Sequence, residues 1–346
     1  MDNLTIDSFL LLNNTNDTCP APLLWTQAIV EDEKAALAIC IIASVIHATF
    51  WFQLIFSSSI RQKSMQWIYA YLLTDIFLLF RFYFSYTLHT TYTECNPSRS
   101  RIVFICYLEA ILDNYFNILK VYILFILNVC RYVQIVYNQN VYEVHKYLLI
   151  LAHVLIYVIP LIVYIAPCLL GWTDAGGFIR DTCVIFYANT YIQIFNTIFA
   201  FALPIFLNIL VIYSSIRHVR IKAALQKSQH YVSAREKLNR SLVIQFICFY
   251  TVWGGLWSPN IIVYQASINK KDLIYIVGLL NYIDVAIDPI IVAALDFRLW
   301  HAWRKHIIRV KRTVLFQKIS HGRVKPSTAN VNTISARTPR QKTTTM

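Results

Sequence analysis

Seven apolar stretches recur along the chain of 346 residues, and each is long enough to cross a lipid bilayer as a helix. About 20 residues suffice, because an α-helix rises about 1.5 Å per residue across a hydrocarbon core about 30 Å thick. The stretches are Ala35–Phe56, Trp67–Leu88, Ile102–Val136, Tyr147–Leu170, Tyr187–Ile216, Leu242–Ala266 and Leu273–Leu295. Only 14% of the residues are charged, against about a quarter in soluble domains. The sequence therefore predicts an all-α membrane protein, with a bundle of seven transmembrane helices over residues 35–295.

Lysine and arginine residues are distributed unevenly among the predicted loops. Most of the 31 lie in the loop after the fifth stretch and in the segment after the seventh. Loops rich in these residues stay on the cytoplasmic side, so we expect an extracellular N-terminus and a location in the plasma membrane. The net charge of +13 then reflects this orientation and an attraction to anionic membrane lipid. No nucleic-acid partner is needed to explain it.

The two ends of the chain differ in composition from the apolar stretches. Residues 1–34 carry three Asn-x-Thr sequons, at Asn3, Asn13 and Asn16, which predict an extracellular glycosylated segment. Residues 313–346 are rich in Ser, Thr, Lys and Arg and poor in large apolar residues. That composition is typical of a disordered tail, here basic and cytoplasmic.

The third apolar stretch contains three ionisable residues on a single stripe. Lys120 follows Asp113 by 7 residues and Arg131 follows Lys120 by 11, and at about 100° per residue both steps return to within about 20° of one direction. Ionisable side chains within a membrane usually face the interior of the bundle and pair with one another. The stripe therefore marks the face of this helix on which we expect function.

Short motifs on these stretches resemble those of rhodopsin-like (class A) G-protein-coupled receptors, and the chain is identified as a divergent member. In the family's order they are "LLTDIF" with Asp75, "NVCRY" with Arg131, "LPIF" with Pro204, "LWSPN" with Trp257 and Pro259, and "DPIIV" with Asp288 and Pro289. The segment "DFRLWHAWRK" resembles the family's short amphipathic eighth helix, which would cover residues 296–312. The chain departs from the pattern at Cys130 before the arginine, at Val292 and at His47.

The resemblance implies a receptor that transduces an extracellular ligand of unknown identity to a heterotrimeric G protein. It implies no catalytic residues, no cofactor and no metal. Arg131, Pro259 and Pro289 would act in activation and coupling, and phosphorylation of the tail would recruit arrestin. Cys106 and Cys183 would form the family's disulfide bond. A second bridge between Cys19 and Cys95 is an open alternative to two free thiols.

In many members of the family, two acids restrain the arginine that stands here as Arg131. One acid precedes the arginine and the other lies on the sixth helix. Cys130 and Asn239 occupy those positions in this chain, and Glu236, nearly one turn below, is the nearest substitute. We therefore expect a weakly restrained receptor with measurable basal signalling.

Asp113 stands where amine-binding members carry the aspartate that pairs with the ligand ammonium, and Tyr282 matches the tyrosine that bonds this aspartate. The other expected pocket residues are Asn117, Trp257, Asn196, Asn260 and Tyr264. Glu109, one turn above Asp113, would add negative charge at the entrance. These residues suit a cationic amine or a small basic peptide. The alternative is that Asp113 pairs internally, with Arg81 or Arg101.

The resemblance also implies a polar site deeper in the bundle. Members of the family commonly hold a sodium ion between the second-span aspartate, here Asp75, a third-span serine and polar residues of the seventh span. Lys120 stands at the serine position, and Asp284 and Asp288 lie four residues apart on one helical face. We expect the lysine ammonium to take the place of the sodium ion. At least one carboxyl group would be protonated, because three carboxylates exceed one ammonium.

Three other functional classes fit the sequence less well. A retinal-binding rhodopsin needs a lysine in the seventh stretch, and that stretch has none. A seven-helix transporter or channel that uses the intramembrane charges is the remaining alternative, although its usual paired repeats and broken helices are absent from the sequence. An enzyme is not expected, because the sequence contains no metal-ligand, nucleophile or phosphate-loop spacing.

Overall fold

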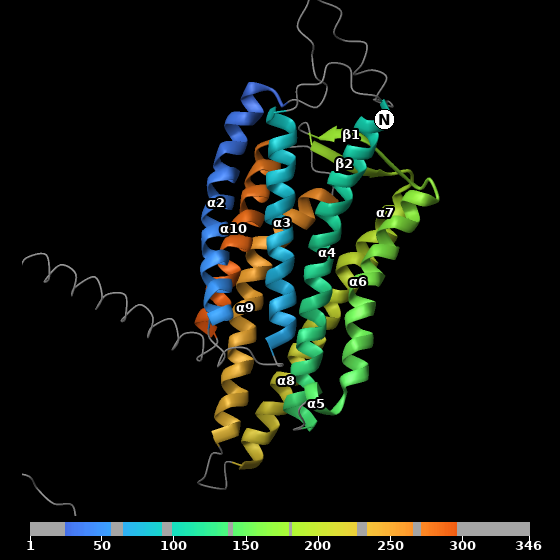
Figure 1. Cartoon of the computed structure of the whole chain (residues 1–346). Helices are drawn as coiled ribbons and strands as arrows, with labels where there is room; N and C mark the ends of the chain where they lie inside the picture. The colour runs from blue at the N-terminus through green and yellow to red at the C-terminus, as the bar shows by residue number, and fades with distance from the viewer. Residues whose placement is uncertain are drawn as a thin grey trace, which may run out of the picture. The chain divides into compact units, whose positions relative to one another are not determined.

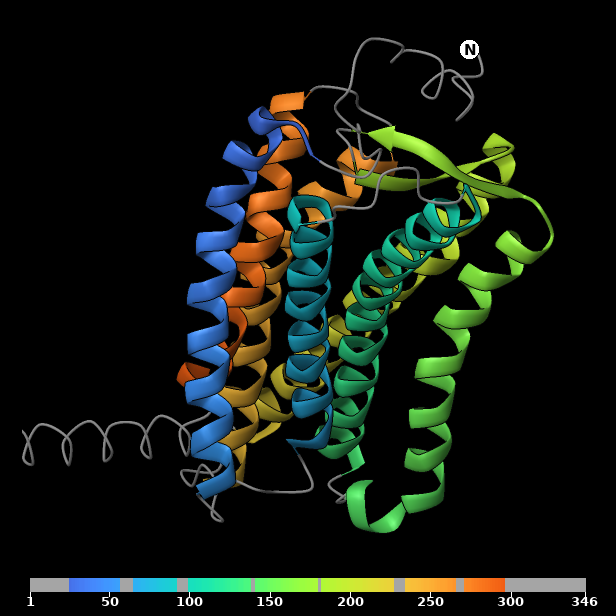
Figure 2. The same ribbon diagram turned by 45° about the horizontal axis from the view of Figure 1, so that its top comes forward.

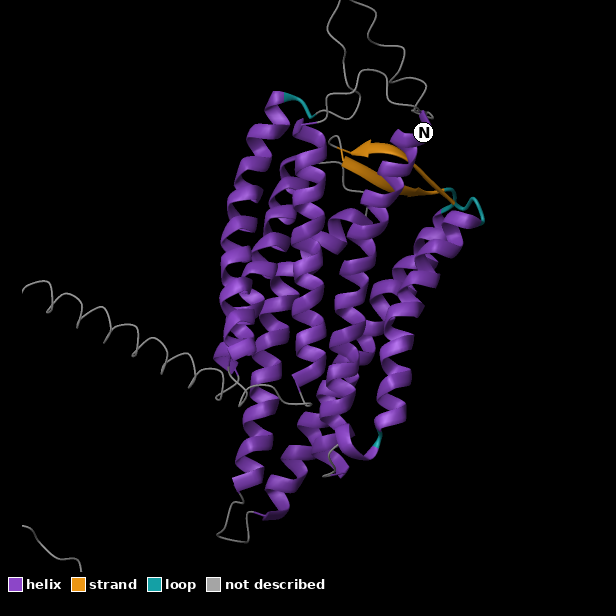
Figure 3. Cartoon of the chain, in the orientation of Figure 1, coloured by secondary structure: helices purple, strands orange, loops and turns teal. Residues whose placement is uncertain are grey.

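The computed structural model describes residues 25–56, 65–91, 99–137, 141–179, 182–226, 234–265 and 271–295 (Figure 1). The three sequons, Cys19, Cys95, the expected eighth helix and the tail lie outside these residues. The described chain is almost entirely helical (Figure 3). Its long helices are α2 (Gln27–Phe56), α3 (Gln66–Thr91), α4 (Arg99–Tyr137), α6 (Lys146–Leu169), α8 (Leu203–Gln226), α9 (Ala234–Gln265) and α10 (Lys271–Leu295).

Within the described residues, six helices are long and apolar enough to cross a membrane, which indicates a membrane-embedded protein. Five of them are α2, α3, α4, α6 and α10, and the sixth is the continuous helical segment Thr190–Lys222. The sixth predicted stretch, Leu242–Ala266, falls on α9, which packs against α10 and α8 but is not among these six. The predicted total of seven membrane spans therefore stays a prediction.

The helices are arranged around α4. This helix packs against α3, α8 and α6, while α10 packs against α2 and α9. Figure 2 shows α2 and α10 on one side of the bundle and α6 on the other. Because α4 contacts helices on both sides, the side chains on its interior face meet partners from most of the bundle.

A β-hairpin departs from the expected all-α fold. Strands β1 (Thr173–Ile179) and β2 (Thr182–Tyr187) pair antiparallel in the connection between α6 and the next helix. The turn that leaves α6 passes through Gly171, whose φ of 68° favours glycine. The hairpin lies at one end of the bundle, against the first turns of α4 (Figure 1). We call this the hairpin end.

The expected disulfide involves this hairpin. Cys106, on α4, is disulfide-bonded. Cys183 belongs to β2, which packs against α4, but its side chain lies outside the described residues. The pairing of these two cysteines therefore remains a prediction.

The helical segment after the hairpin contains a π-helical turn. Helix α7 (Thr190–Thr197) begins after Asn189, whose side chain accepts a hydrogen bond from the backbone N–H of Tyr191. The π-helix η2 (Ile198–Ala202) then leads into α8. Tyr122 of α4 donates a hydrogen bond to the Phe199 carbonyl at 2.8 Å. That contact satisfies a backbone acceptor within the irregular turn.

Small residues allow α2 to approach its neighbours closely. Ala36, Cys40 and Ala43 are buried, and they share a cluster with residues of α3 and α10. A helix with small residues on its interior face brings its backbone near the adjacent helix, which strengthens van der Waals packing within a bilayer. The other members of the cluster are Leu78, Leu79, Phe82, Val285 and Ala286.

The close packing of α2 predicts that Ala43→Phe will destabilise the bundle. Ala43 is fully buried, so a phenyl ring must displace its neighbours, at a cost of about 1–3 kcal/mol in the free energy of unfolding. Ala48, on the exposed face of the same helix, gives the matched control Ala48→Phe. Thermal unfolding of the purified proteins in detergent should show a lower midpoint for Ala43→Phe alone. Equal midpoints for the two variants would contradict this account of the core.

Candidate functional site

Lys120 lies at the centre of a buried charge cluster. Its Nζ atom is 2.8 Å from Asp75 Oδ1, 3.0 Å from Asp284 Oδ2 and 3.0 Å from Asp288 Oδ2. The lysine comes from α4, one aspartate from α3 and two from α10. All four side chains are at most 1% exposed. The contact expected from the sequence is therefore present, and it joins Lys120 to all three carboxyl groups.

The surroundings of Lys120 reinforce this arrangement. Tyr71 donates a hydrogen bond to Asp288 Oδ2 at 2.7 Å, and the Lys120 ammonium lies 4.9 Å from the centre of the Tyr71 ring. His47 of α2 has its Nε2 atom 3.0 Å from the Val285 carbonyl oxygen. Among the described side chains, no group of His, Cys, Asp and Glu is arranged as a metal site. The Lys120 ammonium is the positively charged group that contacts all three carboxyl groups.

The cluster has more acidic than basic groups. One ammonium faces three carboxyl groups, and the three remaining oxygens, Asp75 Oδ2, Asp284 Oδ1 and Asp288 Oδ1, have no hydrogen-bond partner among the described residues. An isolated charge in an environment of low dielectric constant is very costly. That at least one of these carboxyl groups binds a proton therefore stays a prediction, and a change in its protonation would alter the contacts between α3, α4 and α10.

Asp113 is paired with Arg81 towards the hairpin end. Arg81 Nη2 lies 3.1 Å from Asp113 Oδ1, and it donates a hydrogen bond to the Tyr282 hydroxyl at 3.0 Å. Asp113 therefore pairs internally with Arg81, as the alternative reading of the sequence had it. Tyr282 was expected to bond Asp113 directly, whereas the hydrogen bond that its hydroxyl accepts comes from Arg81. The arginine and aspartate side chains are 14% and 30% exposed.

Asn117 and Trp257, the residues expected to form the floor of the pocket, are joined to each other and to the backbone of Asp113. Asn117 donates a hydrogen bond to the backbone carbonyl of Asp113 at 2.9 Å and accepts one from Trp257 Nε1 at 3.2 Å. Trp257 is fully buried and stacks on Trp253, with ring centroids 4.5 Å apart. These bonds connect the Asp113 region of α4 to Trp257 of α9, which lies two positions before Pro259.

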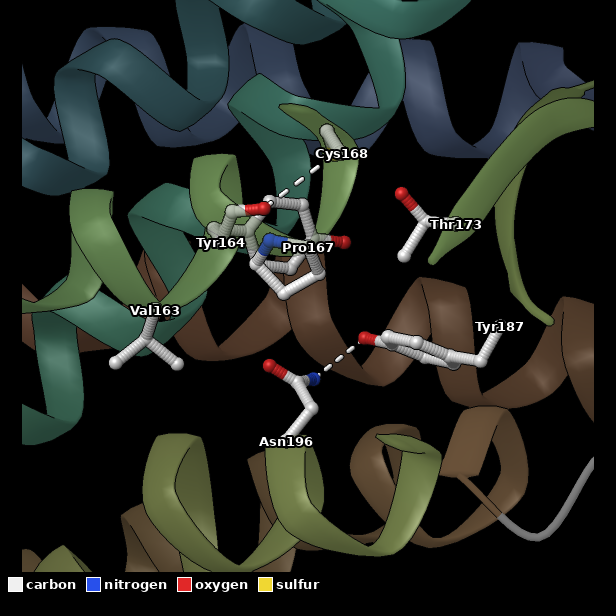
Figure 4. Close-up of a pocket in the computed structure, with 7 residues that line it drawn as sticks. All are labelled: Val163, Tyr164, Pro167, Cys168, Thr173, Tyr187 and Asn196. Atoms are coloured by element: carbon white, nitrogen blue, oxygen red, sulfur yellow. Dashed lines mark hydrogen bonds between the residues drawn. The ribbon is translucent and has the colours of Figure 1, made fainter. Parts of the chain in front are cut away.

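The residues expected to form the wall of the pocket are Asn196, Asn260 and Tyr264. Asn196 lies on α7 in a narrow pocket near the hairpin, where it donates a hydrogen bond to the Tyr187 hydroxyl at 2.5 Å (Figure 4). Asn260 is buried on α9, and the side chain of Tyr264 lies outside the described residues. The pocket is lined by Val163, Tyr164, Pro167, Cys168, Thr173, Tyr187 and Asn196. Its residues come from α6, the two strands and α7.

Glu109 does not lie at an open entrance. It is 2% exposed, and its Oε2 atom is 3.1 Å from His89 Nε2 of α3. Trp25 stacks on His89, with ring centroids 4.8 Å apart and an interplanar angle of 10°. The expectation of an exposed negative charge was wrong because α3 supplies a partner. No sequence pattern indicated that Trp25, which precedes α2, would stack on His89.

A polar triad that the sequence did not predict lies towards the opposite end of the bundle. Asn128 Nδ2 is 2.6 Å from Asn208 Oδ1 and 2.5 Å from the Tyr250 hydroxyl, and that hydroxyl is 3.1 Å from Asn208 Oδ1. The triad joins α4, α8 and α9 near Arg131, which is half-buried. The presence of two asparagines in otherwise apolar stretches is the sequence signal that could have revealed it.

Comparison with known proteins does not identify a family or a function for this chain. No protein family model matches the chain, and the search of curated proteins found no match. Any functional conclusion therefore rests on the residues and contacts described above.

The central cluster predicts that Lys120→Met will destabilise the protein severely. Removal of one partner of a buried ion pair costs about 3–5 kcal/mol, because the remaining charge has no compensation. Neutralising the cluster as a whole, by adding Asp75→Asn, Asp284→Asn and Asp288→Asn, should recover much of the loss in thermal unfolding measurements. The control is Lys34→Met at a half-exposed ion pair of α2. Equal effects of Lys34→Met and Lys120→Met would refute the central role of Lys120.

Proposed function

We propose that this protein is a divergent receptor of the rhodopsin-like class that transduces an extracellular ligand to a heterotrimeric G protein. The observation that carries the proposal is the order of polar contacts along α4. Asp113 forms an accessible ion pair towards the hairpin end, Lys120 forms a buried cluster midway, and Asn128 forms a triad near the opposite end. Together with the motifs on the apolar stretches, this order suits the passage of a signal across a membrane.

A ligand at Asp113 would act on α9 through Asn117 and Trp257. Because Asn117 is bonded to both the Asp113 backbone and the Trp257 indole, a shift of Asp113 changes a contact made by α9. Pro259 lies inside α9 and removes one backbone hydrogen bond, which makes the helix easier to bend at that point. The inner half of α9 would then move away from the Asn128 triad and open a surface for the G protein beside Arg131. Pro289, inside α10, would allow a similar adjustment of that helix.

The remaining features of the proposal follow from the resemblance and the charge distribution. The N-terminal segment is extracellular and glycosylated at Asn3, Asn13 and Asn16, and Cys183 is the partner of Cys106. The tail binds arrestin after phosphorylation, and an amphipathic eighth helix over residues 296–312 lies on anionic lipid of the plasma membrane. With that helix and α9, the bundle has seven transmembrane helices and one interfacial helix.

A transporter or channel is the second functional class, and the Lys120 cluster argues against it. A transported ion or proton must exchange with water on each side of the membrane. All four charged side chains of the cluster are at most 1% exposed, which favours a static or switching role over a conduction path. Proteoliposomes loaded with a pH-sensitive dye would reveal proton movement. Protein-dependent flux that Lys120→Met abolishes would replace the receptor proposal.

Basal nucleotide exchange on G proteins is the direct test of the receptor proposal. Cell membranes that contain the wild-type protein should exchange guanine nucleotide faster than mock-transfected membranes, and Arg131→Ala should lower the rate to the mock level at equal surface expression. Asn128→Leu should raise the rate, because it removes two hydrogen bonds that restrain α8 and α9. If no G protein responds to any of the three proteins, the proposal fails.

The role of Lys120 as an internal cation predicts insensitivity to sodium. Replacing sodium chloride by choline chloride at equal ionic strength should leave the thermal midpoint of the wild-type protein unchanged. Lys120→Ser removes the ammonium from between three carboxyl groups. Sodium should bind there instead, so sodium chloride should raise the thermal midpoint of this variant. Sodium-dependent stabilisation of the wild-type protein would contradict the substitution of Lys120 for the ion.

A further inference from the structure

We propose that Tyr71 is a positioning residue that couples the buried Lys120 cluster to α9 and thereby limits basal signalling. The inference rests on the receptor function proposed above, and it specifies what holds α9 in its resting position. Tyr71 stands on α3, four residues before Asp75, and its side chain is 1% exposed. It contacts the charge cluster on one side and an aromatic ring of α9 on the other.

The hydroxyl and the ring of Tyr71 both contact the charge cluster. The hydroxyl donates a hydrogen bond to Asp288 Oδ2 at 2.7 Å, and the centre of the ring lies 4.9 Å from Lys120 Nζ. A hydrogen bond to a carboxylate is stronger than one between neutral groups, and an ammonium is attracted to the face of an aromatic ring. Contacts with α10 and α4 therefore fix the position of a ring that α3 carries.

The same ring supports α9. Its centroid lies 5.7 Å from that of Phe249 at an interplanar angle of 74°, which is the edge-to-face arrangement that aromatic pairs prefer. Phe249 is 7% exposed, so this contact lies inside the bundle. The next residue, Tyr250, packs its ring against Phe249 and belongs to the Asn128 triad. Tyr71 thus touches α9 directly beside the group that holds α9 to α4 and α8.

These contacts form a closed path that begins and ends on α4. The path runs from Lys120 through Tyr71, Phe249 and Tyr250 to Asn128, which follows Lys120 by eight residues. When the inner half of α9 moves away from α4, the path must open at the triad and at the contact between Tyr71 and Phe249. The ring contact is weaker than the charge-assisted hydrogen bond, so Tyr71 stays with the cluster while Phe249 leaves.

The hydroxyl of Tyr71 determines how firmly the ring holds α9. While it is bonded to Asp288, the ring keeps one orientation, and the contact with Phe249 forms without further loss of side-chain freedom. Without that bond the ring gains freedom, and the contact with Phe249 becomes less favourable. A change at the buried cluster therefore alters the equilibrium between two positions of α9, which is the coupling free energy that links two sites.

The position of α9 can be measured without a G protein, by double electron–electron resonance on the full-length protein in lipid nanodiscs. Spin labels are attached at Ile244→Cys of α9 and Phe56→Cys of α2, which are 52% and 72% exposed, and Cys248→Ser removes an exposed native thiol. Tyr71→Phe should raise the ratio of displaced to resting distances by about threefold or more, because a hydrogen bond to a charged group is lost. An unchanged ratio overturns the proposal.

A double-mutant cycle separates this coupling from a general loosening of the bundle. Phe249→Leu removes the same contact from the α9 side, so it should raise the ratio by itself, and Tyr71→Phe should add nothing in that background. The matched control is Tyr83→Phe on the same helix, which removes a hydrogen bond with Ser44 of α2 and should leave the ratio unchanged. A full effect of Tyr71→Phe in the Phe249→Leu background, or an equal effect of Tyr83→Phe, also overturns the proposal.

The coupling proposal and the receptor proposal fail in different ways. In cell membranes, Tyr71→Phe should also raise basal nucleotide exchange by about threefold. Basal exchange that depends on Arg131, with α9 distances that do not change in Tyr71→Phe, would overturn the coupling and leave the receptor function supported. Distances that change as expected, without any G-protein response, would support the coupling and overturn the receptor function.

Discussion

The ionic contacts of Lys120 set the relative positions of three helices. Because its ammonium lies within 3.0 Å of carboxyl groups from α3 and α10, these two helices and α4 cannot rotate or slide independently without exposing charge to an apolar environment. The tight packing of small residues on α2 against the same helices adds an apolar restraint. The ends of these helices extend from this fixed centre. A displacement of the helix ends therefore requires less free energy than a displacement of the helices at the Lys120 cluster.

The polar groups of α4 consequently form layers with different exposure. The layer that contains Asp113 is accessible, the layer around Lys120 is buried, and the layer around Asn128 consists of neutral amide and hydroxyl groups. Neutral hydrogen bonds are weaker than the ion pairs of the central cluster and can be exchanged for bonds to water at low cost. This difference makes the third layer the natural place for reversible separation of α9 from α4 and α8.

Helical periodicity explains how much of this site could be predicted. The stripe of charges on α4 and the four-residue spacing of Asp284 and Asp288 on α10 both place charged side chains on the interior faces of their helices. The contacts of Lys120 with these aspartates follow from that placement. The Arg81–Asp113 pair could only be left as an alternative, because its choice depends on the rotation of α3 against α4. The Asn128 triad depends on three helices at once, and the hairpin occupies a connection whose conformation no periodic pattern defines.

The π-helical turn between α7 and α8 has a geometric consequence for the two asparagines of that segment. Asn196 and Asn208 are 12 residues apart, which on a regular helix would place them about 120° apart around the axis. The turn at Ile198–Ala202 absorbs about one extra residue, and the angle falls to about 20°. One irregular turn thus lets a single helix direct an amide towards the hairpin pocket and another towards Tyr250. The segment works as two helices in different rotational phase, joined end to end and held at the joint by the Tyr122 hydroxyl.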